Sequence, residues 1–185
     1  MPLALGFAAM ERLPDQQFNP ASTAFLTLAL LFGAIGEEML FRGYGFQIAI
    51  GAIGRIAAVV ITSLVFGWAH SNNQNVSWLG LVNTIGFGVV LAYAFLRSGD
   101  LWLPIGLHFG WNWIFPLFGI SLSGFTMEVT GYAMRWNVPE LWSGGAYGPE
   151  ASIPVCGVIV ALLFFLYRAP VSSQIPPLAQ PRQEA

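Results

Sequence analysis

Three ionisable residues lie inside a long apolar stretch near the start of this 185-residue chain. Glu37, Glu38 and Arg42 follow the run 25–32 (FLTLALLF), which has the composition of half a membrane helix. An ionisable side chain at the centre of a membrane helix costs at least about 2.5–3.5 kcal/mol, even on a lenient insertion scale. A chain that carries these three residues so close together must gain either chemistry or specific packing from them.

The overall composition indicates an integral membrane protein. The chain is 56% hydrophobic and only 9% charged, whereas a soluble domain is typically about 25% charged. Every basic residue is an arginine and the net charge is −2, which excludes a basic surface for nucleic acid. We therefore expect a lipid bilayer around the chain and no nucleic-acid partner.

Hydropathy predicts an all-α fold, a polytopic transmembrane helix bundle with about five membrane helices and one long surface loop. A membrane span needs roughly 20 mostly apolar residues. The predicted spans cover residues 22–41, with the helix continuing toward Ile50, and then residues 53–70, 78–96, 101–120 and 153–167. The glycines and prolines within residues 121–150 predict the one long connection.

The chain divides into three parts by composition. Residues 1–21 form an N-terminal polar or interfacial segment, 22–168 a single helical domain, and 169–185 a disordered C-terminal tail rich in Pro, Gln and Ser. Asn19 and Pro20 predict the start of the first helix, and Glu150 is expected to cap the start of the last one.

Three arginines suggest how the spans are oriented. Arg55, Arg97 and Arg168 fall at alternate span boundaries, which places them on one side of the bilayer. Because cytoplasmic loops carry an excess of basic residues, this side is expected to be cytoplasmic.

Helical spacing separates the two glutamates. Residues i and i+4 share a helix face, whereas i and i+1 point about 100° apart. Glu38 is therefore predicted to pair with Arg42, and Glu37 to point elsewhere without a partner. A free carboxylate in apolar surroundings suits a general base that acts on water. The alternative is a purely structural clamp between helices.

Histidines and an asparagine supply the remaining polar groups. His70 ends the second predicted span, and His108 lies four residues before Asn112, on the same helix face. Asn112 could donate a hydrogen bond to an oxyanion. The structural alternatives are an interfacial histidine and a hydrogen bond between helices, worth only about 0.6 kcal/mol in membranes.

Together these side chains could converge on one polar cavity. The predicted limits put Glu37 deep in its helix and His70 at a helix end, so convergence requires tilted or broken helices. Two histidines and one glutamate, here Glu37, His70 and His108, could hold a divalent metal such as zinc with one open position. Glu37 could equally act on water directly, with no cofactor, while the histidines and Asn112 polarise a carbonyl group.

Three motifs in order carry a family resemblance. They are Glu37-Glu38-x-x-x-Arg42, Phe66-x-x-x-His70 and His108-x-x-x-Asn112. Their order and spacing resemble the CPBP family of intramembrane proteases, also called the Abi or CAAX-protease family, which includes the Ras-converting prenyl-protein endopeptidase. The resemblance covers about residues 22–168.

The resemblance implies a multi-pass membrane endopeptidase, a hydrolase of the bacterial cytoplasmic membrane. It implies Glu37 as the base that activates water, His70 and His108 as further catalytic residues, and Asn112 as the group that stabilises the oxyanion. Glu38 and Arg42 would support the site. Both glutamate-type and metalloprotease descriptions exist in the family. The substrate would be a peptide or protein, either lipidated or inserted in the membrane.

Two other functions use the same side chains differently. A non-enzymatic immunity or scaffold protein of the same family would keep the motif residues for structure. A proton-coupled transporter would use intramembrane carboxylates for ion movement, although the chain lacks the paired half-helix repeats common in transporters.

Overall fold

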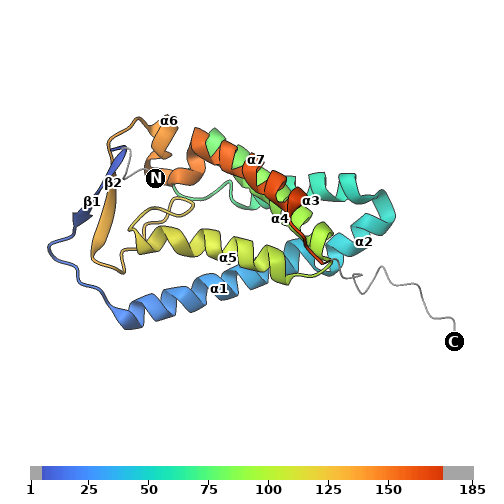
Figure 1. The fold of residues 1–185 in the computed structure, drawn as a ribbon, viewed down its shortest axis with the longest axis horizontal. Helices are drawn as coiled ribbons and strands as arrows, with labels where there is room; N and C mark the ends of the chain where they lie inside the picture. Colours follow the sequence, from blue (N-terminus) through green and yellow to red (C-terminus); the bar gives the residue numbers. More distant parts are fainter. Residues whose placement is uncertain (1–5, 173–185) are drawn as a thin grey trace.

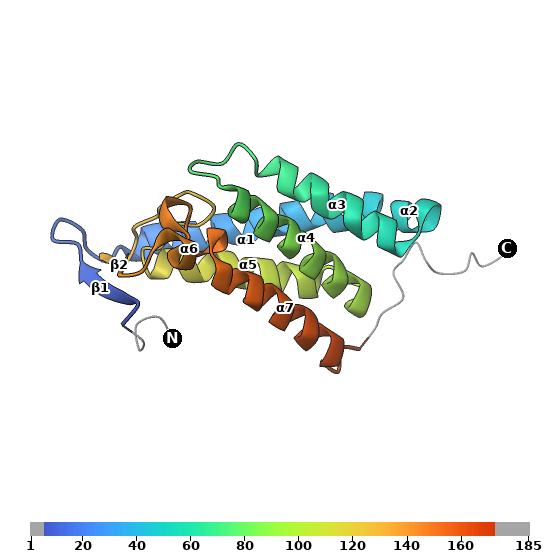
Figure 2. The ribbon, with the colours of Figure 1, turned by 90° about the horizontal axis from the view of Figure 1, so that it is seen from above.

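Five helices lie along one axis in this computed structural model, which describes residues 6–172 (Figure 1). A further helix, α2, turns the chain at one end, and a two-stranded sheet lies at the other (Figures 1 and 2). The elements are β1 (Ala8–Arg12), α1 (Pro20–Arg42), α2 (Tyr44–Ile53), α3 (Arg55–Ala69), α4 (Trp78–Ser98), α5 (Trp102–Leu117), β2 (Tyr132–Trp136), α6 (Glu140–Ser143) and α7 (Ile153–Arg168), with two short 3-10 helices, Gly145–Tyr147 and Pro149–Ala151, before α7. The chain is mostly helical, as predicted, but the predicted all-α fold is incomplete because β1 and β2 form a small sheet.

Helix α1 begins where the sequence predicts. The Asn19 side chain accepts a hydrogen bond from the Ser22 amide at 3.0 Å, and Pro20 is the first helical residue. Such a cap satisfies one of the free amide groups of the first turn, and proline lacks the amide that would otherwise stay free there.

The predicted continuation of α1 toward Ile50 is interrupted at Gly43. A Cβ atom at this position would lie 2.2 Å from the carbonyl oxygen of Met39, so only glycine fits. The chain bends there, and α2 continues as a separate helix to Ile53.

Helix α4 lies in the middle of the bundle and contributes to two apolar clusters. One cluster joins it to α7, and the other joins it to α2 and α3. Their buried members are Val90, Ala94, Val155, Ile159 and Leu166 in the first, and Phe46, Ala58, Ala92 and Phe95 in the second.

Two helical segments are long and apolar enough to cross a bilayer. They are Pro20–Ile53, which comprises α1 and α2, and Trp78–Ser98, which is α4. The helices α3, α5 and α7 have 15 or 16 residues each, fewer than the roughly 20 that a perpendicular span needs. A helix is thus present at each of the five predicted spans, but within the described residues only Pro20–Ile53 and Trp78–Ser98 are long and apolar enough to cross a bilayer.

The outer faces of these helices expose large apolar side chains. Phe25 and Phe32 on α1, and Ile56 and Trp68 on α3, are among the most exposed. Contiguous exposed apolar surface is typical of contact with lipid or with another protein.

The sheet joins two segments that the sequence analysis kept apart, residues 1–21 and 121–150. β1 and β2 are antiparallel, with Ala8 opposite Trp136 and Arg12 opposite Tyr132. Each strand has only five residues and its partner lies more than 100 positions away. No local alternation or turn could therefore reveal the pairing, and neither strand was predicted.

Helix α3 is displaced along the bundle toward α2 (Figure 2). Because the chain passes through α2 before it returns, the end of α3 at Ala69 lies beside the last turns of α1 rather than beside its start. This offset, which follows from the interruption at Gly43, brings residue 70 level with Glu37.

The three arginines of the orientation argument lie at one end of the bundle. Arg55 begins α3, while Arg97 and Arg168 belong to the last turns of α4 and α7, and these helix ends face the same way in Figure 2. The predicted C-terminal tail lies outside the described residues from residue 173 onward.

Helices α3 and α4 approach closely at Gly88, which generates a prediction. A Cβ atom there would lie 2.9 Å from the Cα atom of Ser63. We expect Gly88→Ala to lower the free energy of unfolding by about 1–3 kcal/mol, the usual cost of overpacking. Denaturant titration in detergent micelles measures this change.

Gly157→Ala is the matched control for Gly88→Ala. A Cβ atom at Gly157, inside α7, meets nothing within 4 Å. Alanine is the better helix former, so this variant should be as stable as the parent or slightly more stable. Equal stability of the two variants would contradict the close packing of α3 on α4.

Candidate active site

A cavity of about 770 Å³ lies between α1, α3, α4, α5 and the connection that follows α5. Glu37, His70, His108 and Asn112 all line it. The structure therefore brings the four predicted site residues together, while their catalytic roles remain predictions.

The predicted ion pair within α1 is present. Arg42 Nη1 lies 3.0 Å from Glu38 Oε1, and both side chains are fully buried. Arg42 also donates to the carbonyl oxygen of Gly88 on α4 at 3.0 Å, and its guanidinium group lies 4.7 Å from the centre of the Phe66 ring. The charge of Arg42 therefore links α1 to α3 and α4.

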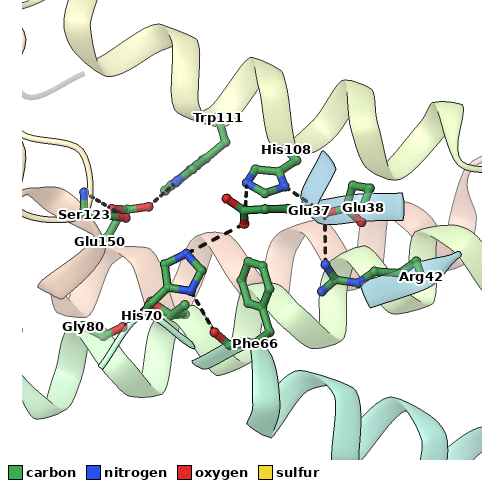
Figure 3. Close-up of polar contacts among 11 residues, drawn as sticks. Glu37, Glu38, Arg42, Phe66, His70, Gly80, His108, Trp111, Ser123 and Glu150 are labelled. Atoms are coloured by element: carbon green, nitrogen blue, oxygen red, sulfur yellow. Dashed lines mark hydrogen bonds and ion pairs between the residues drawn. The ribbon is translucent and has the colours of Figure 1, made fainter. Parts of the chain in front are cut away.

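The same oxygen of Glu38 also orients His108. His108 Nδ1 lies 2.8 Å from Glu38 Oε1 (Figure 3). Because a carboxylate paired with arginine can only accept, Nδ1 carries the proton and donates this bond. In the neutral imidazole, Nε2 then presents a lone pair to the cavity.

His70 is oriented in the same way by a backbone group. Its Nδ1 lies 2.8 Å from the carbonyl oxygen of Phe66, which can only accept, so Nδ1 again is the donor. The Phe66 ring packs against the His70 ring at 4.6 Å and against the His108 ring at 6.1 Å between centroids. Phe66 thus sets the position of both imidazoles, and His70 Nε2 is left with a lone pair.

Glu37 completes a group of three acceptor atoms. Its Oε2 lies 3.9 Å from His70 Nε2 and 3.9 Å from His108 Nε2 (Figure 3). This oxygen is buried and has no hydrogen-bond partner among the described residues, although 38% of the side chain is exposed. Three acceptors that face one another need a donor between them.

A water molecule can donate to two of these three acceptors at a time. Two hydrogen bonds of about 2.8 Å that meet at a water oxygen readily span 3.9 Å between acceptors. No three His, Cys, Asp or Glu side chains within residues 6–172 are arranged to hold a metal ion together. The role of Glu37, His70 and His108 as zinc ligands stays a prediction.

Asn112 lies one helical turn beyond His108 on α5, so both face the cavity as their spacing predicts. The side-chain amide is a neutral donor. Because the Nε2 atoms of both histidines present lone pairs, Asn112 is better suited than the neutral imidazoles to donate to an oxygen that gains negative charge.

Glu150 is a second carboxylate in the cavity wall, and the prediction that it caps α7 is wrong. Ser152 occupies the N-cap position of α7, without a side-chain hydrogen bond to the first turn. The Glu150 side chain instead accepts hydrogen bonds from Trp111 Nε1 at 3.0 Å and from the Ser123 amide and hydroxyl at 2.6 and 2.8 Å. No local pattern could indicate these bonds, because the partners lie 39 and 27 positions away.

Tyr147 lies close to Glu150 outside the long helices. Burial, and to a lesser degree the negative charge of Glu150, raises the pKa of its hydroxyl above the ordinary value. The group therefore stays neutral at physiological pH.

Comparison with known proteins agrees with the motif order. The family model described as "Type II CAAX prenyl endopeptidase Rce1-like" matches residues 19–114, about half of the chain. An "Uncharacterized 24.3 kDa protein" of Escherichia coli is 36% identical over 114 residues, which cover 57% of this chain and 48% of that protein. The chain thus spans about half the length of this relative. No solved structure matches the chain.

The two neighbouring glutamates should differ in their effect on stability. Arg42→Met leaves Glu38 as an unpaired buried charge, so we expect the free energy of unfolding to fall by about 3–5 kcal/mol. Glu37→Gln removes no hydrogen bond to a described residue, and we expect a change within about 1 kcal/mol. Denaturant titration of both variants in the same micelles provides the comparison, and a similar loss in both would show that Glu37 is also structural.

Proposed function

Because the chain belongs to the family of Rce1-like type II CAAX prenyl endopeptidases, we propose that it is a membrane-embedded endopeptidase that uses Glu37-activated water. The observation that carries this proposal is the Glu37 carboxylate oxygen, buried without a partner and 3.9 Å from each of two imidazole nitrogens. Glu38 also has one buried oxygen without a partner, Oε2. Its Oε1, however, is held by Arg42 and His108, whereas Oε2 of Glu37 faces two imidazole nitrogens.

The proposed surroundings are the cytoplasmic membrane of a bacterium, crossed several times. Support comes from the apolar segments Pro20–Ile53 and Trp78–Ser98 and from the exposed apolar faces of α1 and α3. The proposed substrate is a peptide or protein segment, lipidated or inserted in the membrane, that reaches the cavity between α1, α3 and α5.

In the first step Glu37 takes a proton from water while the water oxygen attacks the carbonyl carbon of the scissile peptide bond. The second proton of the water donates a hydrogen bond to Nε2 of His70 or His108 and so orients the water, since the Nδ1 protons of these histidines are held by Phe66 and Glu38. The carbonyl oxygen becomes an oxyanion, and the Asn112 amide donates a hydrogen bond to it.

In the second step the protonated Glu37 gives its proton to the nitrogen of the leaving amine. The C–N bond breaks, and the products are a new carboxylate and a new amine. Glu37 is a carboxylate again at the end of the cycle, so the same residue serves as general base and then as general acid.

Replacement of Glu37 tests the proposal. We expect Glu37→Gln to lower the rate of cleavage by about 10²–10⁴-fold, the usual contribution of a general base. Wild-type and Glu37→Gln chains would be expressed in bacterial membranes, and new peptide N-termini that depend on Glu37 would be identified by mass spectrometry. Purified protein in liposomes would then cleave the identified peptide in H₂¹⁸O, with one ¹⁸O expected in the new carboxylate.

Glu140→Gln is the control for this experiment, because Glu140 is an exposed carboxylate on α6 outside the cavity. It should cleave like the wild type. Equal cleavage by wild type and Glu37→Gln would overturn the proposal. Two results together would favour the non-enzymatic scaffold. One is that no new N-termini depend on Glu37, and the other is that the Glu37→Gln chain melts at a lower temperature than the wild type.

Chelation separates direct action on water from metal dependence. If Glu37 acts on water directly, as proposed, cleavage should stay within about twofold after treatment with EDTA and phenanthroline. Loss of cleavage that zinc restores would instead assign Glu37, His70 and His108 as metal ligands.

A further inference from the structure

We propose that Glu150 is a positioning residue that fixes the connection 118–127 as a wall of the substrate cavity, and that it acts on substrate binding rather than on the chemical step. This inference rests on the proposed function and deepens it. Glu150 lies outside residues 19–114, which match the family model.

Glu150 is itself held firmly in place. Asn83, a buried residue of α4, donates from Nδ2 to the backbone carbonyl oxygens of Glu150 and Ser152 at 2.8 and 3.0 Å. The Glu150 side chain is then buried in the cavity wall. The central helix of the bundle therefore determines where this carboxylate points.

The Glu150 carboxylate joins two other parts of the cavity wall (Figure 3). Oε1 accepts from Trp111, which lies on α5 three residues beyond His108. Oε2 accepts two bonds from Ser123, in the connection after α5. One buried charge thus binds the helix that carries His108 and Asn112 to the connection that faces it.

The backbone of the connection needs this support. Ser123 has a φ angle of +49°, in the left-handed region that a residue with a side chain rarely adopts. The two hydrogen bonds to Glu150 stabilise this conformation, and the Gly124 amide adds a bond to the Tyr147 carbonyl oxygen at 2.8 Å. Residues next to this turn, Leu122, Phe125 and Met127 among them, present their side chains to the cavity.

Glu150 does not contact the three acceptor atoms of Glu37, His70 and His108. Both of its oxygens are occupied by donors from Trp111 and Ser123. Its loss should therefore leave the water site intact and loosen only the surface against which a substrate packs.

Glu150→Gln is the informative replacement, because it keeps the size of the side chain. Glutamine has one oxygen and one NH₂ group, whereas the donors of Trp111 and Ser123 surround both positions. In either orientation of the glutamine amide, a donor of Trp111 or Ser123 would then face the NH₂ group and have no acceptor. The double variant Glu150→Gln/Trp111→Phe removes the indole donor, so the NH₂ group can face the phenyl ring while the oxygen still accepts from Ser123. Glu140→Gln is again the control.

Two measurements on the full chain in micelles decide the proposal. Amide hydrogen exchange of residues 118–127 should become about tenfold faster or more in Glu150→Gln, with α4 unchanged. For the peptide whose cleavage depends on Glu37, KM should rise by about fivefold or more while kcat stays within about twofold. The double variant should be closer to the wild type in both measurements.

Unchanged exchange in residues 118–127 would overturn the proposal, and so would a fall in kcat at constant KM. A general loss of exchange protection, α4 included, would show that Glu150 supports the whole fold and would also overturn it. If the wild type cleaves no peptide, the proposed function fails, and the exchange measurement still decides whether Glu150 holds the connection.

Discussion

The buried ion pair between Glu38 and Arg42 is the interaction on which the rest of the site depends. Both side chains are fully buried, and a buried pair is stable only when further hydrogen bonds compensate its lost hydration. Gly88 supplies one of these bonds to Arg42, and His108 supplies one to Glu38. These two bonds require α4 and α5 to pack against α1 in one arrangement. That arrangement leaves the neighbouring Glu37 at the cavity, where nothing binds its inner oxygen.

The two histidines depend on this arrangement in different ways. His108 is oriented by a charged carboxylate, whereas His70 is oriented by the backbone carbonyl of Phe66. In both cases the Nδ1 proton is held, so both Nε2 atoms face the cavity as acceptors. This common tautomer leaves two imidazole acceptors beside Glu37, so one water can donate to Glu37 and to one of the imidazoles. Under the proposal, donation to a substrate oxygen falls to Asn112 rather than to a neutral imidazole.

The cavity extends beyond the segment that carries the motifs. The family match ends at residue 114, yet the cavity wall includes Leu122, Ser123 and Glu150. These residues come from the connection that links α5 to α7, the part of the chain that also holds β2. The segment with the motifs forms the water site, and the following segment forms the surface opposite it. Under the proposal, chemistry and substrate selection are thus carried by different parts of the chain.

The sequence by itself determined what depends on local spacing. The cap at Asn19, the pairing of Glu38 with Arg42 and the shared face of His108 and Asn112 all follow from helical periodicity, which acts over four residues or fewer. Only the tertiary structure decided what joins distant residues. The pairing of β1 with β2, the bond between His108 and Glu38, and the turn of Glu150 toward Trp111 and Ser123 link positions 27 or more apart. Such contacts depend on how the helices are offset and packed. The displacement of α3 brings His70 to Glu37, and it is set by the bends at Gly43 and Gly54 rather than by any pattern within α3 itself.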